Sequence, residues 1–228
     1  MQKITVKELV SFRRKSARNK KSFAYKLKSR QARDKSDVDS EGGGDYWITS
    51  TSCVYNVFKY TDDKLYDNKI EELRAKLTIS GDKRIKDMYQ RNIDILNSFK
   101  DFDFYEIKPA ETLTFEKVTK AYTILTIKHL PLYVNPRLIF SFNKNGKKVL
   151  GALWLIPQLE GFKKSELGLF CEMLFRFLIK NYSNDYQISE EYCIAIDTYN
   201  AQKVIYSELL RGDLPFLIDK TLEEINDS

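Results

Sequence analysis

The sequence has a single histidine, His129, among its 228 residues. A zinc site would therefore have no second histidine and no nearby cysteine, and a Ser-His or Cys-His nucleophile pair would have to use His129. Neither GxxxxGK[ST] nor GxGxxG occurs, and these are the glycine-rich loops that cradle phosphates. These absences argue against a zinc enzyme and against a nucleotide-binding loop of either kind, and we predict no metal site.

The three cysteines, Cys53, Cys171 and Cys193, lie far apart and form no CxxC pair. Each stands among apolar residues, so we expect buried, reduced thiols and a reducing compartment. No apolar run approaches the roughly 18 residues that a membrane span needs, and the first residues lack the apolar segment of a secretory signal. We therefore expect a cytoplasmic protein without a membrane partner.

The positive charge of the chain is concentrated at its beginning. Hydrophobic residues make up 43% and aromatic residues 13% of the sequence, which is ample for a packed core. The formal net charge is +6, yet residues 1–35 contain thirteen Lys and Arg and only two acidic residues. The remainder of the chain is net negative. An asymmetry of this kind indicates a segment that binds polyanions.

Residues 11–30 contain nine basic residues and no acidic one. They are the candidate nucleic-acid-binding residues: Arg13, Arg14, Lys15, Arg18, Lys20, Lys21, Lys26, Lys28 and Arg30. Phe12, Phe23 and Tyr25 lie among them, and they could stack on bases or anchor the helix to the rest of the protein. Thr5 and Glu8 have the spacing of a capping box, so a helix should begin there and continue as one long basic helix or two.

The composition predicts three parts of the chain. Residues 1–35 should form a basic N-terminal helical arm, and residues 36–45, which end in Gly42–Gly44, a flexible linker. Residues 46–228 should form a single globular domain. We place the boundary between arm and domain near residue 45.

The expected globular domain begins with helical patterns and continues with strands. A helix over residues 53–58 and two amphipathic helices over 70–77 and 85–99 should come first. Two apolar runs flank Asn145-Gly146, which is a strong hairpin signal, and the second run should lie in the middle of the sheet. A largely buried helix follows, with Glu172, Arg176 and Lys180 as its exposed line, and then a second strand pair and a last helix. This order predicts an α+β or α/β fold with a mixed sheet of about five strands.

A magnesium-dependent nuclease site is the one catalytic alternative. If residues 104–108 form a strand, Glu106 and Lys108 share a face, and Asp103 or Asp101 could add a second carboxylate. Mg²⁺ would then be the cofactor; otherwise we expect none and assign no catalytic residue. Asp197 ends the run "IAID" and is interpreted as a turn-capping residue.

Parts of the globular domain resemble RecB/Cas4-like nucleases of the PD-(D/E)XK superfamily. The stretch "ITSTSCVYNVFKY" is similar to their opening helix, "NPRLIFSFNKNGKKVLGALWLIPQ" to their hairpin and "ELGLFCEMLFRFL" to the helix that follows. In that family the first strand carries a metal-binding Asp and the second carries (D/E)-x-Lys. Here Arg137 follows Pro136 where the Asp is expected, and Ala152, Leu153 and Trp154 replace (D/E)-x-Lys. The resemblance implies a catalytically silent relative, such as an accessory subunit of a DNA-processing or phage-defence assembly.

Three functions are consistent with these observations. The first is a non-catalytic protein that grips the phosphate backbone of nucleic acid with its basic arm. The second is a protein-interaction module whose arm docks on an acidic partner subunit, because charge density alone does not separate two polyanionic partners. The third is the magnesium-dependent nuclease.

Overall fold

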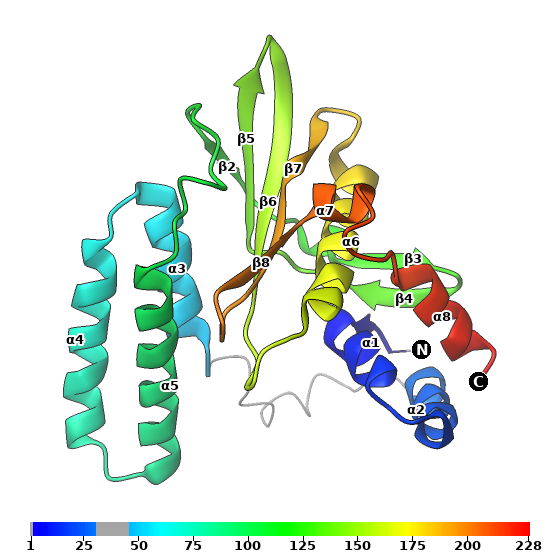
Figure 1. The fold of residues 1–228 in the computed structure, drawn as a ribbon, viewed down its shortest axis with the longest axis horizontal. Helices are drawn as coiled ribbons and strands as arrows, with labels where there is room; N and C mark the ends of the chain where they lie inside the picture. The colour runs from blue at the N-terminus through cyan, green and yellow to red at the C-terminus, as the bar shows by residue number, and fades with distance from the viewer. Residues whose placement is uncertain (1, 31–45) are drawn as a thin grey trace.

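The structure is a computed structural model that describes residues 2–30 and 46–228. Within these ranges the elements are, in chain order, β1 (Ile4–Thr5), α1 (Val6–Arg13), α2 (Ala17–Ser29), α3 (Ile48–Tyr60), α4 (Lys64–Ile79), α5 (Lys83–Lys100), β2 (Thr114–Glu116), the 3₁₀ helix η2 (Lys120–Thr123), β3 (Ile124–Ile127), β4 (Leu130–Tyr133), β5 (Leu138–Lys144), β6 (Lys147–Ile156), α6 (Lys164–Tyr182), β7 (Gln187–Asp197), β8 (Gln202–Ile205), α7 (Tyr206–Leu210) and α8 (Ile218–Asn226) (Figure 1). The predicted α+β class is confirmed. None of the helices in these ranges is long and apolar enough to cross a membrane.

The central sheet has the predicted hairpin at its middle. Its strand order is β2-β5-β6-β7-β8, so β6 is the central strand, as expected. Asn145 and Gly146 join β5 to β6 with φ values of 52° and 75°, which is the left-handed pair of a type I′ turn. β6 runs antiparallel to β5 and parallel to β7, and α6 makes the crossover between the two parallel strands. The expected mixed sheet of about five strands is therefore present.

The two faces of β6 contribute to two separate hydrophobic cores. Leu150, Ala152 and Ile156 face the layer that contains α6, whereas Val149 and Leu153 face the helices α3, α4 and α5. The alternation follows from the period of two residues in a strand. Figure 1 shows the resulting layers, with α3–α5 on one side of the sheet and α6 on the other. A strand segment that is buried on both faces must be apolar, and β6 is apolar from Val149 to Ile156, after the exposed Lys147 and Lys148.

The N-terminal helices lie inside the core on the α6 side, which corrects the prediction of a separate arm. Ile4, Leu9 and Phe12 have no exposed surface, and Ala24 and Leu27 of α2 are buried with them. β1 also pairs in parallel with β4, in a second sheet of order β1-β4-β3. The described part of residues 1–35 is thus part of the globular domain. The predicted linker, residues 36–45, lies outside the described residues.

The last helix is held by a buried carboxylate of α6. Glu172 is 1% exposed, and its Oε2 accepts hydrogen bonds from the backbone N–H groups of Leu217 (2.9 Å) and Ile218 (3.1 Å) at the start of α8. Glu172 also forms an ion pair with Arg176, one helical turn further along, at 2.7 Å. The predicted exposed line is wrong at Glu172, because α8 covers this position, while Lys180 is exposed.

All three cysteines fall in the described ranges and are buried, free thiols, as predicted. The Sγ of Cys171 on α6 donates to the carbonyl oxygen of Cys193 on β7 at 3.3 Å. Burial raises the pKa of Cys53 to about 11, so this thiol is a weak nucleophile. The cysteines contribute packing rather than reactivity.

The substitution Phe12→Ala tests whether α1 belongs to the core. Removing this fully buried ring should lower the free energy of unfolding by about 3–5 kcal/mol. Tyr25→Ala is the matched control, because the Tyr25 side chain on the next helix is 70% exposed and its loss should change stability by less than about 0.5 kcal/mol. Urea unfolding followed by circular dichroism measures both. Equal, small effects of the two substitutions would contradict the packing of α1.

Candidate nucleic-acid interface

The nine candidate basic residues lie on α1, on α2 and at the ends of these helices. The predicted capping box is confirmed: the N–H of Glu8 donates to Thr5 Oγ1 at 3.3 Å, and the N–H of Thr5 donates to Glu8 Oε2 at 2.8 Å. α2 begins after Ser16, so the basic stretch forms two helices rather than one. Because both helices pack on the core, their basic residues occupy distinct environments.

Two of the nine arginines and lysines form bidentate ion pairs with carboxylates of the same domain. Arg14 donates to both oxygens of Glu166 on α6, with Nε–Oε1 2.7 Å and Nη2–Oε2 2.6 Å. Arg30 donates to both oxygens of Glu8, with distances of 2.5 and 3.0 Å. A bidentate pair fixes the orientation of the guanidinium. These two arginines therefore attach the N-terminal helices to the domain.

Three more of the nine contact α8. The contacts are Lys20 Nζ to Glu224 Oε2 (2.5 Å), Arg13 Nη1 to Thr221 Oγ1 (3.1 Å) and to Glu224 Oε1 (4.0 Å), and Lys28 Nζ to the Asn226 carbonyl oxygen (3.2 Å). Glu224 is thus shared by one cation from α1 and one from α2. Five of the nine predicted residues consequently have partners within the protein.

The carboxylates in these pairs have lowered pKa values. Burial, the largest single influence, raises the pKa of Glu8 and of Glu166, but the hydrogen bonds from Arg30 and Arg14, those from backbone N–H groups and the attraction of the two positive charges together outweigh it. Both pKa values therefore lie below the ordinary 4.5. The hydrogen bond from the Lys20 ammonium lowers the pKa of Glu224. The ion pairs therefore stay formed throughout the neutral range.

The remaining four basic residues are exposed and form no ion pair with any residue in 2–30 or 46–228: Lys15, Arg18, Lys21 and Lys26. Tyr25 projects among them and is 70% exposed, whereas Phe12 is buried and Phe23 packs on the core. We call the surface formed by Lys15, Arg18, Lys21, Tyr25 and Lys26 the basic face. Of the candidate residues, the basic face contains the four cations without an ion pair to a described residue and Tyr25, whose ring is the one of the three aromatic rings that is exposed to a ligand.

The three candidate catalytic residues do not assemble into a site. Residues 101–108 form turns and bends, not the strand that the nuclease alternative requires. Asp103 Oδ1 accepts the N–H of Tyr105 at 2.7 Å, and the N–H of Ile107 donates to the Phe104 carbonyl at 3.1 Å. These local hydrogen bonds bend the backbone, so no strand places Glu106 and Lys108 on one face.

The candidate side chains instead have other partners. Glu106 pairs with Lys203 of β8 at 2.6 Å. Lys108 Nζ donates to the Phe58 carbonyl oxygen at 2.7 Å and to Thr61 Oγ1 at 2.6 Å, which fastens the turn to the end of α3. Burial lowers the pKa of Lys108. Its contacts are those of a side chain that joins two parts of the fold.

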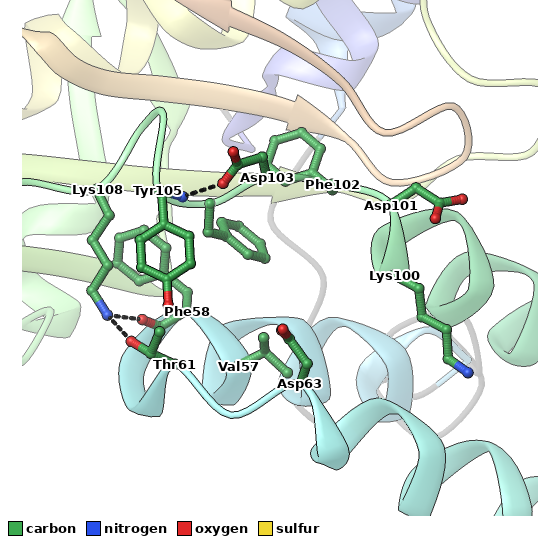
Figure 2. Close-up of a pocket in the computed structure, with 11 residues that line it drawn as sticks. Val57, Phe58, Thr61, Asp63, Lys100, Asp101, Phe102, Asp103, Tyr105 and Lys108 are labelled. Carbon is green, nitrogen blue, oxygen red and sulfur yellow. Dashed lines mark hydrogen bonds between the residues drawn. The ribbon is translucent and has the colours of Figure 1, made fainter.

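Asp103 and Lys108 line the same cavity but point apart. This cavity, of about 210 Å³, lies between the end of α3 and the turns after α5 (Figure 2). Figure 2 shows the ammonium of Lys108 turned toward Thr61 and the carboxylate of Asp103 turned toward the N–H of Tyr105. Asp63 and Asp101 also line it, yet the structure described here contains no group of three His, Cys, Asp or Glu side chains placed to hold a metal ion. The geometry required by the nuclease alternative is not formed at these residues.

The hairpin positions singled out by the family resemblance carry no metal ligands. Ala152 and Leu153 are fully buried on opposite faces of β6. Arg137 is exposed just before β5, and Trp154 is half-buried near the end of β6. Asp197 is buried and accepts from the N–H of Tyr199 at 2.9 Å, in agreement with its predicted turn-capping role.

Comparisons of the chain with protein-family models, curated proteins and solved structures found no match. The resemblance to RecB/Cas4-like nucleases therefore stays a prediction. What the protein binds has to be inferred from its own side chains.

The acidic partners of the basic residues could not be predicted from the sequence, since Glu166 lies 152 residues from Arg14. The sequence does indicate which basic residues of α2 face the domain and which face the solvent. Lys20, Ala24 and Leu27 follow helical spacing and share the covered side of the helix. Arg18 and Lys26 fall on the opposite side, so the two apolar residues of α2 indicate which cations remain outside.

Acid should weaken the attachment of α1 and α2. The lowered pKa values mean that the ion pairs of Glu8, Glu166 and Glu224 stabilise the fold fully above pH 4.5 and that this stabilisation is lost as the pH falls below it. The triple variant Glu8→Gln, Glu166→Gln, Glu224→Gln should be less stable than the wild type by about 1–3 kcal/mol at pH 7.

Urea unfolding of the wild type and of this triple variant at pH 7, 5, 4 and 3 measures the effect. The difference in stability should be constant between pH 7 and 5 and should shrink toward pH 3, where the wild-type carboxylates are protonated as well. A difference that is the same at pH 7 and pH 3 would show that these ion pairs contribute nothing to the attachment.

Proposed function

We propose that the protein binds the phosphate backbone of nucleic acid through the basic face, as a non-catalytic subunit. The observation that supports this most directly is the separation of the nine basic residues into two groups. Five have partners within the domain, and Lys15, Arg18, Lys21 and Lys26 stand exposed without a carboxylate from the described residues. A cation that already pairs with a carboxylate gains little free energy from pairing with a phosphate. These four have no carboxylate among the described residues to give up, so they gain more.

The spacing of the exposed cations suits an extended polyanion. Arg18 and Lys26 are eight residues apart on one helix, which is about 12 Å along its axis. Successive phosphates of one strand advance by about 3.4 Å along a duplex, so the face spans about three to four nucleotides. Each phosphate that is neutralised releases counterions, and this release gives affinity without sequence preference.

An exposed aromatic ring favours nucleic acid over an acidic protein as the partner. Tyr25 lies between Lys21 and Lys26 and is 70% exposed. Burying its apolar ring against another surface is favourable, and a base stacked on such a ring contributes about 1–3 kcal/mol. A carboxylate-rich protein surface would engage the cations but would leave the ring without a comparable partner.

A non-catalytic role is supported by the chemistry of the rest of the domain. Glu106 and Lys108 have structural partners, and the hairpin carries Arg137 and Trp154 at positions where the family resemblance expects metal-binding and catalytic residues. If the resemblance holds, an accessory subunit of a DNA-processing or phage-defence assembly is the role that fits these replacements. Binding of nucleic acid would then position the protein for its partners.

The experiment compares two fourfold variants with matched composition. The test variant is Lys15→Gln, Arg18→Gln, Lys21→Gln, Lys26→Gln. The control is Lys83→Gln, Arg84→Gln, Lys86→Gln, Lys144→Gln, which also removes three lysines and one arginine, all exposed and without an ion pair to a described residue. Both variants lose the same net charge, so a difference between them reports the location of the charge.

Fluorescence anisotropy with labelled single-stranded and double-stranded DNA and RNA of about 20 nucleotides, across a salt series, measures the affinity. The wild type and the control should show a linear dependence of log K on log salt, and the slope of the test variant should be shallower by about 3. Equal slopes in the two variants would overturn the assignment of the basic face. No binding of any probe at low salt would overturn nucleic acid as the partner, and cleavage of a probe with Mg²⁺ present would overturn the non-catalytic role.

A further inference from the structure

A second cavity, of about 360 Å³, lies where α1, α3 and the end of β6 meet. Five parts of the chain line it: the start of α1, residues of α3 with Trp47, the segment between β4 and β5 with Arg137, the segment from Trp154 to Pro157, and Phe170 of α6. Its volume falls in the range of about 300–1,000 Å³ that is typical of small-molecule sites. It is separate from the cavity in Figure 2 and from the basic face.

Among the described residues, the charged side chains that line this cavity are both positive. They are Lys7 and Arg137, and no carboxylate of the described residues lines it. Arg137 is exposed and has no ion pair within the part of the chain that the structure describes. Lys7 is exposed as well, and its Nζ donates to the Pro157 carbonyl oxygen at 2.5 Å. An anion in the cavity would supply the counter-charge that both cations lack.

Two helices also begin at the cavity. Thr5 and Val6 at the start of α1, and Trp47 and Ile48 at the start of α3, contribute to its lining. The N-terminal end of a helix carries a partial positive charge and unpaired N–H groups. α1 closes its own end with the capping box, in which the Glu8 carboxylate takes part, so this end contributes little positive potential. At the start of α3, Trp47 provides no side-chain cap, while the N–H of Ser50 donates to Asn92 Oδ1 at 3.0 Å. The partial positive charge at the start of α3 adds to the potential that the two cations create.

The walls of the cavity are aromatic. The rings are those of Trp47, Tyr55, Tyr133, Trp154 and Phe170. Trp154 packs edge-on against Phe170 with centroids 5.5 Å apart, and the Tyr55 oxygen accepts the N–H of Leu155 at 3.2 Å. These contacts hold the rings in place. A site with fixed aromatic walls and two cations recognises a planar ring that carries an anionic group.

We infer that this cavity binds a mononucleotide unit, with its base against the aromatic walls and its phosphate at Lys7 and Arg137. The unit has two possible sources, a free nucleotide or the terminal nucleotide of a strand, and the chemistry of recognition is the same for both. This inference does not depend on the basic face, because the residues of the two surfaces do not overlap. It adds a site for a single nucleotide unit to the proposed basic face, which would span about three to four nucleotides.

The chain contains a built-in reporter for this site. It has two tryptophans, Trp47 and Trp154, and both line the cavity. The intrinsic tryptophan fluorescence of the full-length protein, excited at the long-wavelength edge of the band and corrected with free tryptophan, therefore responds to an occupant. Titration with AMP should give saturable quenching. Adenosine and inorganic phosphate should each require at least about tenfold higher concentrations, because each lacks half of the contacts.

The variant Arg137→Gln tests the phosphate contact. A hydrogen bond to a charged group contributes enough that AMP affinity should fall about tenfold or more. Arg84→Gln is the matched control, since Arg84 is exposed on α5 and outside this cavity, and its affinity should equal that of the wild type. Thermal unfolding of both variants verifies that the fold is intact, which is expected because both arginines are exposed.

Two further probes identify the source of the nucleotide. A linear single strand with a 5′-phosphate should quench more strongly than AMP if the site holds a strand end, and less strongly if it holds free nucleotide. Circular single-stranded DNA has no end, so it should bind the basic face without changing the tryptophan signal. The two proposals can thus fail separately.

Three results would overturn the inference. The first is the absence of saturable quenching with both AMP and the linear strand. The second is equal affinity of Arg137→Gln and Arg84→Gln for AMP. The third is quenching by adenosine at the same concentrations as AMP, which would exclude a phosphate site at Lys7 and Arg137.

Discussion

The burial of Phe12 and Leu9 against α6 is the interaction on which the placement of the basic residues depends. Thirteen Lys and Arg in 35 residues repel one another, and such a segment has little reason to fold alone. Packing its few apolar side chains into a core formed by α6, β4 and α8 stabilises the segment enough to offset this charge repulsion. The N-terminal helices are thereby fixed in orientation, and each of the nine basic residues between positions 11 and 30 has either a partner or an exposed position.

The ion pairs then determine which charges remain for a ligand. Glu8 pairs with Arg30, Glu166 with Arg14, and Glu224 with Arg13 and Lys20. The hydrogen bonds in these pairs help keep the carboxylates ionised. The outer side of α2 has no such partner among the described residues. A helix that is basic on all sides in the sequence thus becomes a helix with one attached side and one free side. A rigid face loses less conformational entropy on binding than a disordered arm would.

Local patterns in the sequence predicted most of the fold. Asn145-Gly146 indicated the hairpin, the continuous apolar run of β6 indicated a central strand, and Thr5 with Glu8 indicated the start of α1. The sequence could not show contacts between distant residues. The few aromatic residues among the charges of the N-terminal segment left two roles open, stacking on bases or anchoring to the domain, and nothing near Glu172 indicated that α8 would cover it. The strand that the nuclease alternative requires around Glu106 does not form for a local reason: the side-chain hydrogen bond of Asp103 competes with strand geometry.

Native-state hydrogen exchange of the free protein tests most directly whether the N-terminal helices are built into the domain. The hydrogen-bonded amides of α1 and α2 should be protected to a degree similar to those of α6, because all three helices share one core and open together. Slow exchange around Leu9, Phe12 and Ala24, measured without nucleic acid, is the predicted result. Exchange of these amides within the dead time, while α6 remains protected, would mean that residues 2–30 are a detachable arm and would contradict the account.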